Sequence, residues 1–145
     1  MPGIVALGEA CRLPILEVAA LRDRLERGVL ERIPETRMNG AGAERTPNTT
    51  NMVFAGVEGE ALLIALDLAG YAVSSGSACS SGAVQPSHVL TAMGLPAADA
   101  KSSLRFSVGN TNTADQVDGL LDVLEKAVSR LRKLSPSCAN LVKIL

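Results

Sequence analysis

The chain has 145 residues, a length that fits one domain with a single buried core. A formal net charge of −1 and only two Phe and one Tyr disfavour a nucleic acid or an anionic membrane as partner. No stretch approaches the roughly 18 uncharged apolar residues of a membrane span. Three cysteines without a secretion signal fit a reducing compartment, so we expect a cytoplasmic protein.

Two helices are predicted in the N-terminal part of the chain. Residues 4–12 favour a short helix that Pro14 breaks. From residue 15, apolar side chains recur at spacings of three and four, which predicts a second helix that ends before Pro34. The charged residues between them are expected to form its solvated face. The apolar stripe consists of Val18, Leu21, Leu25, Val29 and Ile33.

Short strands and one helix are predicted in the middle of the chain. Residues 36–38 could form a strand, and residues 47–50 form a turn cluster before a second strand at 51–55. Residues 58–68 predict a helix that is apolar nearly all round and therefore well buried, with Gly70 as its C-terminal cap. Residues 71–73 predict another strand, which runs into the loop at 74–87.

Three helical segments and one strand are predicted after this loop. Ser87 and Gly94 delimit a helix of under two turns, and residues 97–101 favour one further turn. Residues 103–108 alternate apolar with polar, which predicts a half-buried strand. A final helix spans residues 113–134 and begins with a capping box of Thr113 and Gln116. No structure is assigned to the tail at 135–145.

This order of elements predicts an α/β fold, in which helices cover a small three- to four-stranded sheet, mixed or antiparallel. Because aromatic residues are scarce, the core is expected to consist of Leu, Val, Ile and Ala. The fold class by itself does not identify a function.

The loop at 74–87 combines six serines and two glycines with one thiol, that of Cys79. This composition is typical of a flexible tether. Cys79 is interpreted either as a linker residue without a role or as a nucleophile or sulfur carrier on an arm. No cation lies in the loop to lower the thiol pKa, and His88 is the nearest candidate in the sequence. His88 could instead be a helix-start residue that hydrogen-bonds the loop.

Arg105 is the other candidate site residue, in the middle of the strand at 103–108. It lies either on a plain solvent face or in a position to bind a substrate carboxylate with its guanidinium fork. Cys11 is interpreted as a packing residue and Cys138 as incidental. The three cysteines and the single histidine lack the spacing of a zinc site.

Several motifs together resemble the cysteine desulfurases of group I, the NifS/IscS-like branch of the class V aminotransferases. They are PGIVALG at 2–8, PNTTN at 47–51, GVEGEAL at 56–62, SSGSACSSG at 74–82, PSHVL at 86–90 and LRFSVG at 104–109. The resemblance covers about residues 2–133, and SSGSACSSG resembles the family's active-cysteine loop. It implies the C-terminal small domain of a fold-type I pyridoxal phosphate enzyme, at residues 1–134, followed by a tail at 135–145.

The resemblance also implies a function. Family members take sulfur from L-cysteine, leave L-alanine and pass a persulfide to an iron–sulfur scaffold or another sulfur-acceptor protein. Cys79 matches the nucleophile, which could also ligate a transient iron–sulfur cluster, and Arg105 matches the arginine that holds the substrate carboxylate. The intact enzyme is expected to be a homodimer with pyridoxal phosphate as cofactor.

The chain departs from this family in one respect. Family members have a large domain that supplies the cofactor lysine, and no lysine here lies in a motif like the family's cofactor-binding His-Lys pair. We therefore expect a fragment that alone neither binds pyridoxal phosphate tightly nor desulfurates cysteine. The alternatives are a stand-alone persulfide carrier or interaction module, and a truncation without function. The lysines are Lys101, Lys126, Lys133 and Lys143.

Overall fold

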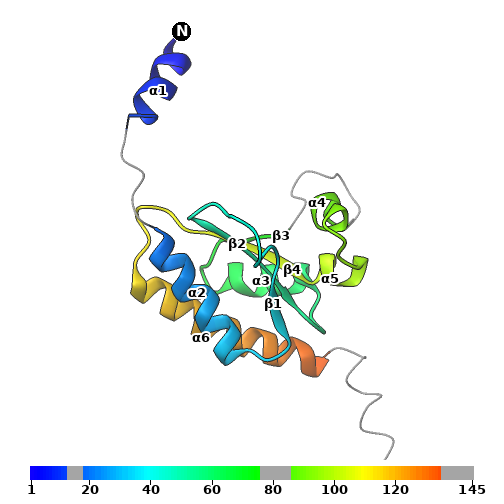
Figure 1. Ribbon diagram of the computed structural model, residues 1–145. Helices are drawn as coiled ribbons and strands as arrows, with labels where there is room; N and C mark the ends of the chain where they lie inside the picture. The colour runs from blue at the N-terminus through cyan, green and yellow to red at the C-terminus, as the bar shows by residue number, and fades with distance from the viewer. Residues whose placement is uncertain (13–17, 76–85, 135–145) are drawn as a thin grey trace, which may run out of the picture.

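Four antiparallel strands form the sheet, in the order β1-β2-β4-β3 (Figure 1). The structure, a computed structural model, describes residues 1–12, 18–75 and 86–134. The longest ladder pairs β2 with β4 and places Asn51 opposite Arg105 and Met52 opposite Leu104. The strands are β1 (Thr36–Met38), β2 (Thr49–Phe54), β3 (Ser74–Ser75) and β4 (Ser103–Ser107).

The helices divide between the two faces of this sheet. Three of them, α2, α3 and α6, cover what we call the inner face, and α6 runs along both α2 and α3 (Figure 1). On the outer face, α5 contacts β2 and α4 contacts α5. The described helices are α1 (Pro2–Ala10), α2 (Ala19–Arg32), α3 (Gly59–Leu68), α4 (His88–Ala92), α5 (Ala97–Lys101) and α6 (Ala114–Leu134). The predicted α/β class with an antiparallel sheet is confirmed.

The core lies between the inner face and its three helices. Most of it is Leu and Val, as expected, but Met52, Phe54 and Phe106 also belong to it. The two phenylalanine rings meet edge to face, with centroids 6.3 Å apart. The prediction of a core without aromatic residues is therefore wrong, because two of the three aromatic side chains lie on the inward positions of β2 and β4.

Several local predictions are confirmed by hydrogen bonds and dihedral angles. Thr113 and Gln116 form the capping box, with bonds of 3.2 and 3.3 Å between each side chain and the other residue's backbone N–H. Gly70 ends α3 with a φ of 88°, and Gly94 has the same φ after α4. Such angles favour glycine, which explains both cap positions.

Other predictions are wrong. The strand expected at 71–73 lies at Ser74–Ser75, because residue 71 still donates to the carbonyl of Leu66 in the cap of α3. The expected burial of α3 on all sides is not observed: Ile64 and Leu68 are 51% and 84% exposed, since only one face of the helix meets the sheet and α6. The strand expected at 51–55 begins two residues earlier, at Thr49, where the pairing with β4 begins.

The N-terminal helix α1 differs from the rest of the fold. It has no buried residue, although its sequence is largely apolar. Cys11, expected to be a packing residue, is exposed at its end, because none of the described elements buries a residue of α1. Among the described residues, no helix is both long enough and apolar enough to cross a membrane.

The charged face of α2 is only partly a solvated surface. Glu26 is 7% exposed and accepts two hydrogen bonds from Arg45, at 2.6 and 3.2 Å. Arg22 lies 3.9 Å from the same carboxylate and donates to the backbone carbonyl of Thr46. These contacts attach the 39–47 loop to α2, so the expectation of a plain solvated face is wrong for Arg22 and Glu26.

The ionisation of Glu26 depends on opposing effects. Burial is the largest influence and raises its pKa, but the hydrogen bonds from Arg45 and the positive charges of Arg45 and Arg22 lower it further than burial raises it. The Thr50 hydroxyl also lies near enough to lower the pKa, although its geometry falls short of a hydrogen bond. The net result is a pKa of Glu26 below its usual value.

The first prediction concerns Gly59, the first residue of α3. A Cβ there would collide with the backbone carbonyl oxygen of Lys101, which cannot move without disturbing the connection from α5 to β4. Gly59→Ala should lower the free energy of unfolding, measured by urea titration, by about 1–3 kcal/mol. Gly42→Ala is the matched control, because nothing lies within 4 Å of a Cβ there. Equal stability of both variants would contradict the prediction.

The second prediction concerns Glu26. Because its pKa is lower in the folded chain, its ionisation stabilises the fold above the unfolded pKa of about 4.3, and this contribution is lost as pH falls through the folded pKa. Glu26→Gln should cost about 1–3 kcal/mol at pH 7 and progressively less toward pH 3, measured by urea unfolding. Glu31→Gln, at an exposed position of the same helix, should have little effect at either pH. A cost independent of pH would refute the role of the charge.

Candidate functional site

Arg105 lies in the middle of β4, on the outer face of the sheet. Its neighbours Leu104 and Phe106 are buried on the inner side, whereas Arg105 itself is exposed. This pattern confirms the half-buried strand predicted at 103–108. Across the two ladders, Arg105 is paired with Asn51 of β2 and Ser74 of β3. The guanidinium therefore originates at the centre of the outer face, flanked by strands on both sides.

A pocket of about 420 Å³ lies on this side of the sheet. Its walls come from β2, from β4, from the loop at 39–46 and from α4. Most of its polar lining is uncharged, and the cations that reach it are Arg45, which is paired with Glu26, and Arg105. No described carboxylate lies in ion-pair contact with Arg105. A guanidinium beside amides and hydroxyls in an open pocket suits a carboxylate or another small anion.

The residues around the start of α4 take different positions. Ser87 precedes the helix at its N-cap, as predicted, is 4% exposed and lines the Arg105 pocket, but its side chain makes no capping hydrogen bond. His88 is exposed at the first position of α4 and does not line this pocket. Ser87 and Arg105 thus line the same pocket, whereas His88 does not line it.

Cys79 lies outside the described residues, in the segment 76–85, as does Cys138 in the segment 135–145. The described residues on either side of 76–85 are nevertheless informative. On one side, Ser74 is paired with Arg105 and Ser75 with Leu104. On the other side, Ser87 lines the Arg105 pocket. The described residues before the segment are thus paired with the strand of Arg105, and those after it line the pocket that Arg105 lines.

Neither a metal-binding cluster nor a lysine is found at the Arg105 pocket among the described residues. No group of three or more His, Cys, Asp or Glu residues among them could hold a metal ion. Lys101, Lys126 and Lys133 are exposed and none lines the Arg105 pocket, while Lys143 lies in the segment 135–145.

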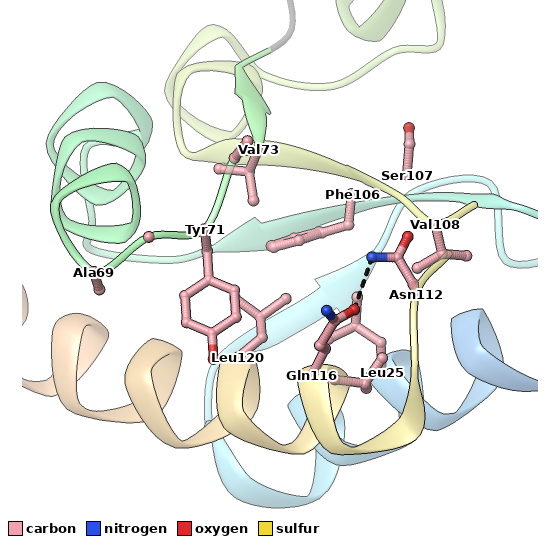
Figure 2. Close-up of a pocket in the computed structure, with 13 residues that line it drawn as sticks. Leu25, Ala69, Tyr71, Val73, Phe106, Ser107, Val108, Asn112, Gln116 and Leu120 are labelled. Atoms are coloured by element: carbon pink, nitrogen blue, oxygen red, sulfur yellow. Dashed lines mark hydrogen bonds between the residues drawn. The ribbon is translucent and has the colours of Figure 1, made fainter. Parts of the chain in front are cut away.

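A second pocket, of about 470 Å³, lies on the inner side between the end of β4, the segment after α3 and the start of α6 (Figure 2). Tyr71, Phe106 and Leu120 form its apolar walls. Its amide side chains are already engaged, because Asn112 donates to Gln116 at 3.2 Å and accepts from the backbone of Gly109 at 2.7 Å (Figure 2). These bonds belong to the capping of α6 and leave the pocket without a charged group to bind an anion.

Reasoning from the sequence missed the polar residues around Arg105. Asn39 donates to the Oδ1 atom of Asn51 at 2.6 Å and to the Oγ atom of Ser103 at 3.3 Å. Asn39 and Ser103 are 9% and 0% exposed, so these are buried polar groups. One signal was available, because asparagine is depleted in strands and Asn51 lies within an apolar one.

Comparison with known proteins gives a consistent result. The family Aminotransferase class-V matches residues 3–120. The chain is 48% identical over 147 residues to a cysteine desulfurase of Cereibacter sphaeroides, covering 99% of this chain and 38% of that protein. It is 46% identical over 143 residues to a cysteine desulfurase of Trichormus azollae, covering 94% and 36%. The chain therefore spans little more than a third of the length of these relatives.

Solved structures show the same similarity. A NifS-like protein from Rickettsia africae superimposes with a TM-score of 0.67 and 32% identity, over 78% of this chain and 28% of that one. A second NifS-like protein gives a TM-score of 0.66 and 27% identity, over 79% and 28%. Since the family match covers 118 of 145 residues, from 3 to 120, the chain belongs to the class V aminotransferase family, and over nearly its whole length it is similar to cysteine desulfurases.

Proposed function

We propose that this chain is the thiol-carrying domain of a cysteine desulfurase, with L-cysteine as substrate and L-alanine as product. One observation supports the proposal most directly. The chain that carries Cys79 is anchored on both sides near Arg105: before the segment, Ser74 is the ladder partner of Arg105, and after it, Ser87 lines the pocket that contains Arg105. A sulfur-accepting thiol and a carboxylate-binding guanidinium must reach the same small substrate, and this arrangement allows it.

In this proposal Arg105 binds the carboxylate of L-cysteine. Arginine suits this role because its planar fork donates two parallel hydrogen bonds to the two carboxylate oxygens. The position of Arg105 in a strand between two paired neighbours restricts the motion of its backbone. The substrate is thereby held by one end, and its sulfur is free to meet a thiol.

The Cys79 thiolate then attacks the sulfur of the bound substrate. A sulfur–sulfur bond forms, the carbon–sulfur bond of the substrate breaks, and its electron pair stays with the carbon skeleton, which takes up a proton and becomes L-alanine. Members of this family depend on pyridoxal phosphate, which serves as an electron sink in such chemistry. Because no described lysine lines the pocket, we assign the cofactor to residues outside those described.

The sulfur held by Cys79 is passed on to an acceptor, for which we propose an iron–sulfur scaffold or another sulfur-acceptor protein. Cys79 is the fourth residue after Ser75, so its Cα atom can lie at most ~14 Å from the end of β3. A reach of this size suits a thiol that serves both a substrate pocket and a second protein. His88, which is exposed at the start of α4, is a candidate for supporting the loop.

We further propose that residues 1–134 are the C-terminal small domain of a longer, homodimeric enzyme in the cytoplasm, with a tail at 135–145. The surface of α1 supports this proposal. Ile4, Val5 and Leu7 are 69%, 70% and 66% exposed, and apolar surface of this kind is usually covered by a further part of the protein. The length of the relatives, of which this chain covers 36–38%, leaves room for such a part.

The third prediction tests the role of Cys79 in a chimera, in which this chain replaces the matching region of the Cereibacter sphaeroides relative. The chimera should release sulfide from L-cysteine in the presence of a reductant, and Cys79→Ser should abolish the release while leaving the visible absorbance of the bound cofactor unchanged. Cys11→Ser is the matched control, because Cys11 is an exposed thiol on α1. If the chimera is inactive and Cys79 accepts sulfur only from an intact desulfurase, the persulfide-carrier alternative replaces this proposal.

The fourth prediction tests Arg105 in the same chimera. Arg105→Ala should raise the KM for L-cysteine about 10- to 100-fold, because hydrogen bonds to a charged group contribute about 1.5–3 kcal/mol. The cofactor should remain bound. Arg130→Ala, at an exposed position on α6 away from this pocket, should leave the KM unchanged. Equal losses of cofactor and substrate affinity in the Arg105 variant would contradict its assignment.

A further inference from the structure

The side chain of Asn51 occupies a defined position beside Arg105. The two residues are direct partners in the ladder between β2 and β4, so their side chains lie on the same face of the sheet. Both line the pocket of about 420 Å³ on that face. Asn51 is half-buried, in contrast to the exposed Arg105. The pocket therefore presents both the guanidinium of Arg105 and the amide of Asn51 to a small anion.

A chain of hydrogen bonds begins at the turn between α5 and β4. The hydroxyl of Ser103 donates to the backbone carbonyl of Asp99 at 2.7 Å. A hydroxyl has a single proton, so the Ser103 oxygen can act only as an acceptor toward its other neighbour. That neighbour is the amide of Asn39 at 3.3 Å, which must therefore present its Nδ2 group to Ser103.

The same Nδ2 group also determines the orientation of Asn51. It lies 2.6 Å from the Asn51 side chain, so Asn51 must present its oxygen to Asn39. The Nδ2 group of Asn51 is then the end of the amide that Asn39 does not contact. Among the described residues, no acceptor forms a hydrogen bond with it. The backbone supports this arrangement, because the N–H of Asn39 donates to the carbonyl of Asn51 at 2.8 Å.

We propose that Asn51 is a second carboxylate-binding residue, whose Nδ2 group donates to an oxygen of the carboxylate held by Arg105. A carboxylate offers about four acceptor sites, so it can accept the two bonds of the arginine fork and a third from an amide. Asn39 and Ser103 are positioning residues, because they decide which end of the Asn51 amide is free. This inference rests on the proposed role of Arg105.

Two other charged residues, Glu44 and Arg45, line the pocket and bear on the inference. Glu44 also lines it, but Glu44 is exposed in the 39–46 loop and forms no ion pair with Arg105 among the described contacts. Arg45 is held by Glu26. Among the side-chain N–H groups that line the pocket, those of Arg105 and the Nδ2 group of Asn51 have no partner in the described contacts, and both suit an acceptor with two oxygens.

The fifth prediction uses the full 145-residue chain labelled with ¹⁵N. Titration with L-cysteine should shift the side-chain NH₂ resonances of Asn51 and the Nε–H resonance of Arg105 with the same concentration dependence. Cysteamine is the matched probe, because it has the thiol and the amine but lacks the carboxylate. It should shift neither resonance. In Asn51→Asp, the Asn39 amide can still donate to the new side chain, so the fold should survive, while the affinity of the Arg105 site for L-cysteine should fall at least about tenfold.

The outcomes separate this inference from the proposed function. If L-cysteine shifts Arg105 but not Asn51, or if Asn51→Asp leaves the affinity unchanged, the inference fails and the role of Arg105 stands. If neither resonance responds, or cysteamine acts like L-cysteine, the carboxylate role of Arg105 fails and the inference falls with it. Ser103→Ala tests the positioning step: it should diminish the Asn51 response while Arg105 still shifts, whereas a residue with only a packing role would leave both responses unchanged.

Discussion

The pairing of β2 with β4 is the constraint on which the rest of this structure depends. Its register places Met52 opposite Leu104 on the inner face and Asn51 opposite Arg105 on the outer face. Side chains alternate along a strand, so a slip by one residue would bury the guanidinium and expose the core side chains. The three inner helices need the apolar face that this register creates, and the polar pocket needs the opposite one. The register of this one strand pair thus determines both which side chains form the core and which side chains line the Arg105 pocket.

Structural features that depend on residues close together in the chain were predicted correctly from the sequence. The alternation around Arg105 predicted a half-buried strand, and Thr113 and Gln116 predicted the start of α6. Both depend on residues within a few positions of each other. The strand expected at 71–73 failed because its place is set by the distant strand β4, and the cap of α3 takes up the residues before it.

The same distinction explains what was missed at the site. Asn39, Asn51 and the pair Asp99 and Ser103 come from three separate parts of the chain, and no short window of sequence contains all the hydrogen bonds between them. Glu26 has the spacing of a surface residue on α2, but the loop from 39 to 47 folds over it and supplies Arg45. Helical periodicity indicates which side of a helix faces the core, but it does not show which loop covers the other side.

The two ends of the segment that carries Cys79 are attached to the fold in different ways. At one end, β3 is paired with β4 at Arg105, so the ladder holds the last described strand before the segment beside that residue. At the other end, Ser87 is buried before α4, and Leu90 fixes that helix to the fold at 5% exposure. Strand β4 therefore carries Arg105 and also holds β3, the last described strand before residues 76–85, so any displacement of β4 would move both together.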